Sequence, residues 1–392
     1  MNDNIILLSH DEQQLRLSRV RGLMKQSGLD AVLIADFANL YYLTGRVYAG
    51  YAYIGGRDGE QMYFVKRMEN FQGDGVVCIR KPEQMSANIK PDASAVIGIE
   101  LDLMNYNMVE RLRGVFPGAQ IKDCTGVMRA ARAVKTDAEL QMLRRSGVLH
   151  EDVYRRIPGL YREGMTDIEL EIEIERALRL EGNLGQFRIS GDTMETYMGS
   201  LITGDNADEP SPYDFAMGGA GLNPSLPTGA CGELIRPGSA VMVDLCGNFT
   251  GYMTDMTRTF SLGSLEKLAM DAHQCSIDII ERLVTLGKPG TPASELYNAA
   301  MEMAKERGLH TYFMGHRQHA GFIGHGVGIE INELPVIAPR SRDILQLHNV
   351  IALEPKFVIP HVGAVGIEST FVVQDFGLEC ITNAPTEIIS LT

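Results

Sequence analysis

The sequence lacks the features that organise several common classes of protein, beginning with paired cysteines. Its cysteines show no CxxC or CxxxxC spacing and stand scattered at positions 78, 124, 231, 246, 275 and 380. A disulfide framework and a zinc site made of thiolates are therefore excluded as the basis of the fold, and buried thiols are expected. For Cys246 two interpretations stay open, packing and an approach to a functional site, because it shares a predicted strand face with Asp244.

Long apolar runs and basic clusters are also missing. No stretch reaches the ~18 apolar residues that a membrane helix needs, and the N-terminal MNDNIILLSH has neither the basic start nor the cleavage site of a signal peptide. The net charge is −14, and Lys and Arg do not cluster as they do in proteins that bind phosphate backbones. We therefore expect no membrane partner, no nucleic-acid partner and a cytoplasmic location.

What remains is the composition of an ordinary globular protein. Of 392 residues, 45% are apolar and 22% are charged, which is typical of a chain that buries a core. At about 100–200 residues per domain, this length allows two or three domains.

The first part of the chain is predicted to be an α/β domain. The capping box from Ser9 to Glu12 opens a helix that Gly28 ends. Apolar runs and helical spacing predict the next elements, which are strands at 31–35 and 95–100 and a helix at 104–116. The pattern changes near residue 130, so we predict domains of residues 1–130 and 131–392.

The second domain is predicted to be α+β. Two further capping boxes and two runs of helical spacing predict helices that begin at Thr136 and Thr166, span 265–287, and run from Pro292, as the first helical residue, to Gly308. From about residue 185 the chain is rich in glycine and predicted strands. Each half, 136–260 and 265–375, has helices followed by a hairpin, which suggests an approximate internal duplication.

Within the second domain, residues 241–260 are predicted to form a hairpin that carries one carboxylate on each arm. Asp244 and Asp255 are equidistant from a turn near Phe249 and Thr250. Such residues lie opposite each other in an antiparallel hairpin, with Cβ atoms roughly 4.5–5.5 Å apart. Two facing carboxylates repel unless a proton or a cation lies between them, so the hairpin predicts a positive charge here.

The same pattern occurs near the C-terminus. The segments NVIALEPKFVIP and GAVGIESTFVVQD flank a turn near His361, and Glu354 and Glu368 are equidistant from it. Between the two hairpins, His325 lies in the glycine-rich GHGVGIEINELP, where backbone can approach closely. Two Asp, two Glu and one His suit two divalent ions bound mainly by oxygen, and Mn, Co, Fe and Zn are all compatible.

These motifs resemble the pita-bread metallopeptidases, the family of methionine aminopeptidase, aminopeptidase P, prolidase and creatinase. The similar segments of the C-terminal part are VDLCGNFTGYMTDMTRTF, GHGVGIEINELP, ALEPKF and GIEST, and GLDAVLIADFANLYYLTG resembles the creatinase and prolidase N-terminal domain. The resemblance implies a pita-bread C-terminal domain preceded by a smaller α/β domain of the creatinase type, and a homodimer.

The resemblance also implies roles for the acidic residues and His325. The metal ligands would be Asp244, Asp255, His325, Glu354 and Glu368. Two ions would lower the pKa of a bridging water and polarise the scissile carbonyl. Glu354 would accept the proton of that water and pass it to the leaving amine.

The sequence departs from the family at several positions. Gly321 and Asn332 replace two histidines, and a third is absent from TGDNADEPSPYD. Gly366 stands where an Arg is common, and Lys356 replaces the Gly that usually follows Glu-Pro. Asn332 can donate a hydrogen bond but cannot carry a proton. We therefore predict poor cleavage of Xaa-Pro dipeptides and a gain from Asn332→His.

Other residues have two open interpretations. His316 and His319 are either spatial substitutes for the missing histidines or surface and structural residues. Lys356 is either a cation for a substrate carboxylate or a solvent-exposed residue at a strand end. Arg258 is expected to brace the hairpin rather than contact substrate.

The leading hypothesis is a hydrolase with two metal ions that resembles Xaa-Pro dipeptidase and aminopeptidase P and acts on a short peptide or small amide-like substrate. Its candidate catalytic residues are Glu354, Asn332 and His319. The alternatives are a hydrolase or lyase for a non-peptide small molecule, as creatinase is, and a non-catalytic metal-binding protein.

Overall fold

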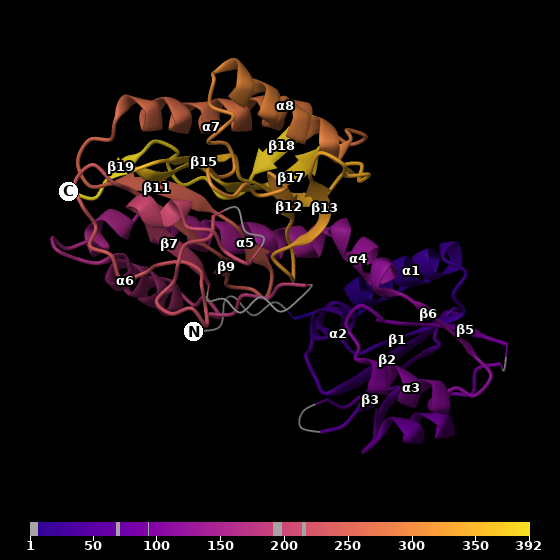
Figure 1. Cartoon of the computed structure of the whole chain (residues 1–392). Coiled ribbons are helices and arrows are strands. Elements are labelled where there is room, and N and C mark those ends of the chain that lie inside the picture. Colours follow the sequence, from indigo (N-terminus) through magenta and orange to yellow (C-terminus); the bar gives the residue numbers. More distant parts are fainter. Residues whose placement is uncertain (1–6, 68–70, 93, 191–197, 214–216) are drawn as a thin grey trace. The chain divides into compact units, whose positions relative to one another are not determined.

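The computed structural model describes residues 7–67, 71–92, 94–190, 198–213 and 217–392. The described residues divide into two compact units, 7–132 and 133–392 (Figure 1). This division lies two residues after the boundary predicted between residues 130 and 131. Among the described residues, no helix combines the length and the apolar character needed to cross a membrane.

The N-terminal unit is built on a mixed sheet of six strands in the order β4-β3-β2-β1-β5-β6. Its strands are β1 (Ala31–Ile34), β2 (Gly50–Gly55), β3 (Gln61–Val65), β4 (Val76–Cys78), β5 (Val96–Ile99) and β6 (Gln120–Asp123). Its helices are α1 (His10–Gln26), α2 (Phe37–Thr44), α3 (Tyr106–Val115) and α4 (Thr125–Ala133), the last ending at the division between the units.

The local signals explain these elements. The Ser9 hydroxyl caps α1 by accepting a hydrogen bond from the Glu12 amide. Strand β1 is buried along its whole length and pairs in parallel with β5, as expected for a continuous apolar run covered on both faces. The predicted helices and strands of this α/β unit are confirmed.

The C-terminal unit contains α5 (Asp137–Tyr154), α6 (Asp167–Leu180), α7 (Lys267–Leu286) and α8 (Ala293–Glu306). Both predicted capping boxes are present, at Thr136 with Glu139 and at Thr166 with Glu169. Pro292 is the N-cap of α8 rather than its first helical residue, so that prediction was wrong by one position.

Its strands form two larger sheets and two short ribbons. The four-stranded sheet has the order β19-β11-β8-β7 and the five-stranded sheet the order β13-β12-β14-β17-β18, while β9 pairs with β10 and β15 with β16. The strands that enclose the site are β8 (Ala240–Leu245), β9 (Gly247–Asn248), β10 (Met253–Thr254), β11 (Thr257–Ser261), β12 (Gly324–Gly326), β14 (Val350–Leu353), β15 (Lys356–Ile359), β16 (Gly363–Gly366) and β17 (Ser369–Gln374). The remaining strands are β7 (Gly199–Thr203), β13 (Glu333–Ile337), β18 (Gly377–Cys380) and β19 (Ile389–Ser390).

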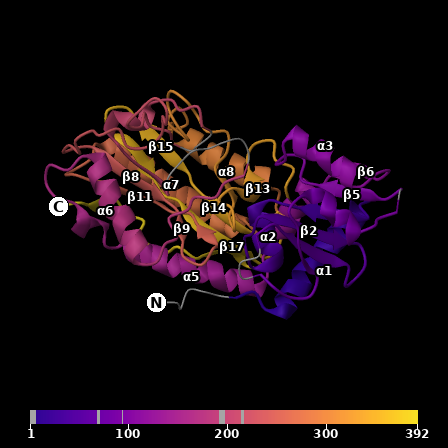
Figure 2. The same ribbon diagram turned by 90° about the horizontal axis from the view of Figure 1, so that it is seen from below.

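These strands lie between two layers of helices. Figure 1 shows α7 and α8 on one side of them and α5 and α6 on the other, and Figure 2 shows α5 and α6 together on the face seen from below. The face of α7 toward the strands is apolar: Ala272, Ile279 and Leu283 belong to the same core as Phe357 and Val365. The predicted α+β class of this domain is confirmed.

The C-terminal hairpin has the predicted register. Leu353 pairs with Ser369 and Lys356 with Gly366, which leaves Glu354 opposite Glu368. The turn is centred on His361, whose φ of 67° is left-handed. Both carboxylates occupy the short gap where the hairpin passes from one sheet to the β15–β16 ribbon.

The first hairpin forms, but the prediction that Asp244 faces Asp255 directly was wrong. Asp244 pairs with Thr257, and Gly247 pairs with Thr254, so the register differs from the prediction by two residues. The turn is centred between Thr250 and Gly251, because Gly251 adopts a left-handed φ of 88°. A shift of two residues keeps side chains on the same strand face, so both aspartates still point toward one site.

Candidate metal centre

The five predicted ligands come together where several strands end or are interrupted. Asp244 lies near the end of β8 and Asp255 directly after β10, while His325 is in the middle of β12. Glu354 follows β14 and Glu368 precedes β17. Ion-pair contacts with His325 or Lys356 connect all four carboxylates into one cluster.

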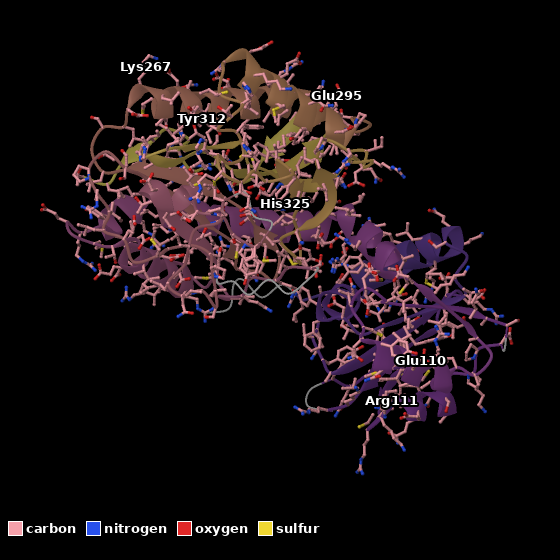
Figure 3. The ribbon with its side chains drawn as sticks, viewed as in Figure 1. Glu110, Arg111, Lys267, Glu295, Tyr312 and His325 are labelled. Atoms are coloured by element: carbon pink, nitrogen blue, oxygen red, sulfur yellow. The ribbon has the colours of Figure 1, made fainter. Side chains whose placement is uncertain are left out.

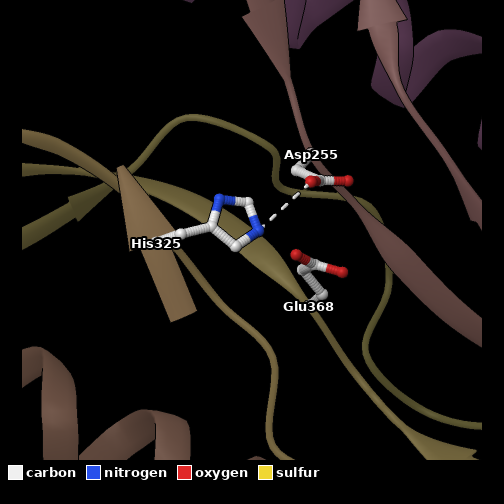
Figure 4. Close-up of side chains that lie close together, drawn as sticks. All are labelled: Asp255, His325 and Glu368. Atoms are coloured by element: carbon white, nitrogen blue, oxygen red, sulfur yellow. Dashed lines mark ion pairs between the residues drawn. The ribbon is translucent and has the colours of Figure 1, made fainter. Parts of the chain in front are cut away.

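One end of this cluster has the composition of a metal site. Asp255, His325 and Glu368 each offer a ligand atom, and these atoms lie within 4.8 Å of one another (Figure 4). The Oε1 atom of Glu368 is buried and has no hydrogen-bond partner among the residues that the structure describes. A buried carboxylate oxygen without a donor is costly, and a bound cation would satisfy it.

The imidazole of His325 is oriented for ligation. Its Nδ1 lies 3.1 Å from the carbonyl oxygen of Gly326, and a proton donated there leaves the Nε2 lone pair free. Nε2 lies 3.5 Å from Glu354 Oε1 and 3.7 Å from Asp255 Oδ2. Figure 3 places His325 in the interior of its unit, among the strands.

The glycines beside His325 are required by the neighbouring strands. A Cβ atom at Gly324 would collide with the carbonyl oxygen of Ala352, and one at Gly326 with that of Leu334. Glycine thus allows the backbone of β12 to approach both of its neighbours, which holds the imidazole against the carboxylates.

The other end of the cluster is occupied by Lys356. Its Nζ donates hydrogen bonds to Asp244 Oδ2 at 2.9 Å, Glu354 Oε2 at 2.9 Å and Glu368 Oε2 at 2.8 Å. The side chain is 0% exposed. The interpretation of Lys356 as a solvent-exposed residue was therefore wrong. Because an ammonium has three N–H donors and all three are used here, the alternative of a cation for a substrate carboxylate is not supported.

Burial and charge act in opposite directions on the ionisable groups of the cluster. Burial by itself lowers the pKa of Lys356, but Asp244, Glu354 and Glu368 together hold that pKa well above its ordinary value. Burial raises the pKa of Asp255 well above its usual range, and the charge of Glu368 raises it further. Asp255 therefore favours a nearby cation.

Neighbouring side chains fix the acids in place. Thr257 Oγ1 donates to Glu368 Oε2 at 2.7 Å, and Thr370 Oγ1 exchanges hydrogen bonds with the backbone of Asp255. Arg258 is 1% exposed. Its guanidinium donates to the carbonyl oxygens of Glu368, Thr382 and Ala384, among others. The prediction that Arg258 braces the hairpin is confirmed.

The residues proposed to replace the family histidines have other contacts. His316 Nδ1 lies 2.8 Å from Asp208 Oδ2, and His319 Nδ1 lies 2.9 Å from the carbonyl oxygen of Phe313. Asn332 accepts from the Ser190 amide and donates to the Ser190 carbonyl, both at 2.8 Å. Catalytic roles for His319 and Asn332 stay predictions, and these contacts do not support them.

Two further positions named in the sequence predictions are Gly321 and Cys246. A Cβ atom at Gly321 would meet nothing within 4 Å, so the space beside this glycine is open. Cys246 is 1% exposed, and burial, followed by the charge of Asp255, raises the pKa of its thiol well above the ordinary value. The inert, protonated thiol that results agrees with the packing interpretation.

The cluster therefore offers one group of residues that could hold a divalent ion. Asp255, His325 and the unpartnered oxygen of Glu368 can hold an ion. One oxygen each of Asp244, Glu354 and Glu368 is already bound to the ammonium of Lys356.

The sequence analysis missed the role of Lys356, although a signal was present. Lys356 lies two residues after Glu354, and alternation along a strand places both on one face. Since Asp244 and Glu368 were expected at the same site as Glu354, Lys356 was a candidate partner for all three carboxylates. The hydroxyls of Thr257 and Thr370 were also missed, and the sequence offers no comparable signal for them.

Comparison with known proteins agrees with this architecture. Residues 141–375 match the model of metallopeptidase family M24, and residues 16–134 match the creatinase/prolidase N-terminal domain. The chain is 26% identical over 380 residues to an Xaa-Pro dipeptidase of Pyrococcus furiosus, covering 95% of this chain and 99% of that protein.

Solved structures show the same fold. An Xaa-Pro dipeptidase from Bacillus anthracis has a TM-score of 0.80 at 22% identity, covering 96% of this chain and 99% of the other. The prolidase from Pyrococcus horikoshii OT3 has a TM-score of 0.77 at 24% identity, covering 96% and 100%. The expected pita-bread fold with a creatinase-type N-terminal domain is confirmed. With the family model matching more than half of its length, the chain belongs to metallopeptidase family M24 and is a hydrolase of the metallopeptidase type.

Proposed function

We propose that this protein is a metal-dependent hydrolase that cleaves short peptides, with dipeptides of the Xaa-Pro type as its first candidate substrates. The observation that carries the proposal is the group of Asp255, His325 and Glu368, with the unpartnered Oε1 of Glu368 directed at no described donor. The names of the similar proteins, which are Xaa-Pro dipeptidases, support the substrate class.

The residues around this group have distinct roles in the proposed reaction. A divalent ion, when bound, lowers the pKa of a coordinated water and polarises a carbonyl. Glu354 is 3% exposed, its Oε2 is held by Lys356, and its Oε1 faces His325. This carboxylate is therefore positioned to accept a proton from water and to return it to the leaving amine.

A second candidate function is hydrolysis of a small amide that is not a peptide. It is favoured by the open space at Gly321 and by the use of both amide atoms of Asn332 in holding Ser190. Gly321 and Asn332 stand where peptidases of the family carry histidines. Without those histidines the site offers fewer hydrogen-bond donors to a peptide carbonyl and to the oxyanion that develops from it. The alternative of a non-catalytic metal-binding protein does not agree with membership of a metallopeptidase family. A bridging hydroxide between two ions, manganese as the native ion, a homodimer and a cytoplasmic location all stay predictions.

The experiment is turnover of a substrate panel. The full chain is stripped of metal and reconstituted separately with Mn, Co, Fe and Zn, then assayed with Xaa-Pro dipeptides, other dipeptides and non-peptide amides. We expect hydrolysis of a dipeptide with at least one metal, and its loss in His325→Ala. His310→Ala, a histidine outside the cluster, is the matched control. Turnover that survives both metal removal and His325→Ala would contradict the proposal.

A further inference from the structure

We propose that the ammonium of Lys356 permanently takes the place of one of two cations, so that the centre binds a single divalent ion through Asp255, His325 and Glu368. The inference rests on the proposed metal centre but not on the identity of the substrate. It concerns which cation neutralises each end of the carboxylate cluster.

The first step is the saturation of the ammonium. Three carboxylate oxygens, from Asp244, Glu354 and Glu368, lie 2.8–2.9 Å from Nζ. These distances are those of strong, charge-assisted hydrogen bonds. All three donors of the ammonium are used, and the oxygens that accept them come from three of the four carboxylates that were predicted to hold two ions. A divalent ion bound to them would also lie next to a positive charge in a buried site, where repulsion is weakly screened.

The second step is the lack of another position for the side chain. Lys356 is the first residue of β15, whose register with β16 is fixed by four consecutive pairs ending at Ile359 and Gly363. Its neighbour Phe357 is fully buried and packs at 5.1 Å, between ring centroids, on Phe313. Because adjacent side chains on a strand point to opposite faces, the core position of Phe357 fixes Lys356 toward the carboxylates.

The third step comes from the residue opposite Lys356. Gly366 pairs with it across the β15–β16 ribbon and has a φ of +137°. A Cβ atom there would lie 2.7 Å from the carbonyl oxygen of Pro355 and 2.9 Å from the Cα of Lys356. The ribbon thus has room for a side chain at Lys356 and none at Gly366. Lys356 and Gly366 are both departures from the family that were noted above. Of the two, only Lys356 places a positive charge in the cluster.

The consequence is an unequal pair of aspartates. Asp244 is hydrogen-bonded to the ammonium, whereas Asp255 lies 3.7 Å from His325 Nε2, beyond hydrogen-bond distance, and beside the Glu368 oxygen that has no partner among the described residues. In this proposal Asp244 pairs with the ammonium of Lys356, and Asp255 binds the ion.

The test is the number of ions bound per chain. The full chain is loaded with Mn²⁺, freed of excess metal, and measured by elemental analysis and by electron paramagnetic resonance, which distinguishes an isolated Mn²⁺ from a coupled pair. We expect one isolated ion in the natural protein and two coupled ions in Lys356→Gly. Lys135→Met is the matched control, because Lys135 is also buried, 1% exposed, and pairs with Glu333, which is not one of the four carboxylates of the cluster. It should leave the count at one.

A second pair of variants does not depend on the folding of Lys356→Gly. Asp244→Asn and Asp255→Asn make the same chemical change at the two aspartates. We expect Asp244→Asn to retain the ion and Asp255→Asn to lose it. Two ions in the natural protein, or loss of the ion from Asp244→Asn with retention in Asp255→Asn, would overturn the inference. No ion in the natural protein at saturating Mn²⁺ would overturn the proposed metal centre itself.

Discussion

The two ends of the carboxylate cluster are made of the same residue types but differ in how their charge is compensated. At the end formed by Asp244 and Glu354, Lys356 Nζ lies 2.9 Å from each carboxylate. At the end formed by Asp255 and Glu368, His325 Nε2 lies 3.7 Å from Asp255, and one oxygen of Glu368 has no partner among the described residues. One end is complete within the chain, whereas the other requires a ligand.

Under the single-ion proposal, one set of acidic residues is neutralised by two different kinds of cation, an ammonium and a metal ion. Buried carboxylates need compensation, and any well-placed positive charge provides it. A lysine provides this charge without polarising a carbonyl or activating water. The presence of all five family ligands therefore does not establish how many ions are bound, and Lys356, two residues after Glu354, is the more informative position.

The largest expected effect comes from Glu368→Gln, because Glu368 contacts both ends. The substitution removes the charge of one metal ligand and one partner of Lys356. We expect loss of the bound ion and a fall in kcat of at least about 10²–10³, the range for losing one strong electrostatic contribution. Kinetics and metal analysis on the same sample are the measurements.

Glu379→Gln is the control for this change. Glu379 forms an ion pair with Arg144 in which both side chains are at least one-third exposed, so its loss should leave metal content and kcat unchanged. Full metal occupancy in Glu368→Gln would contradict the assignment of this residue to the ion.

The next effect concerns the stability of the protein and the end of the cluster that contains Lys356. Lys356→Met keeps an unbranched side chain but leaves the buried Glu354 and Glu368 and the partly buried Asp244 without their ammonium. Removing one partner of a buried ion pair costs about 3–5 kcal/mol. We expect a loss of this size in the unfolding free energy of the metal-free protein, measured by urea denaturation.

Lys267→Met is the comparison, since Lys267 pairs with Asp271 while 85% exposed and should contribute little. If both lysine variants unfold at the same urea concentration as the natural protein, Lys356 does not compensate the cluster.

The smallest expected effect is at Asn332. Asn332→His would introduce a group that can carry a proton, and we expect a few-fold increase in kcat/KM for an Xaa-Pro dipeptide. The increase is limited because Asn332 now holds the Ser190 backbone by two hydrogen bonds at 2.8 Å. Asn332→Gln is the control that keeps an amide. An increase of the same size in Asn332→Gln would show that the gain does not come from the imidazole.

The outcomes of the hairpin predictions show what local sequence does and does not determine. The C-terminal register followed from symmetry about His361, where the chain does turn. In the first hairpin the left-handed Gly251 set the turn centre instead. Apolar and acidic spacing alone could not reveal this, because a shift of two residues keeps every side chain on the same face.

The burial of Lys356 could not be anticipated from general frequencies. Lysine is almost never fully buried unless it is paired, and its three partners come from segments up to 112 residues away in sequence. The helices were easier to predict, since capping boxes such as that of Thr136 and Glu139 act within one turn. Local contacts were therefore predictable, whereas the long-range charge balance of the site was not.

The covalent attachment of the Lys356 ammonium also bears on how the protein would respond to a changing supply of metal. The charge at that end is set when the chain is synthesised, so it is the same in every molecule and cannot be removed by a chelator. Scarcity of metal would empty only the end formed by Asp255, His325 and Glu368. Under the single-ion proposal, the metal-free protein would keep the ammonium that compensates three of its carboxylates. It would therefore stay folded and able to bind an ion again.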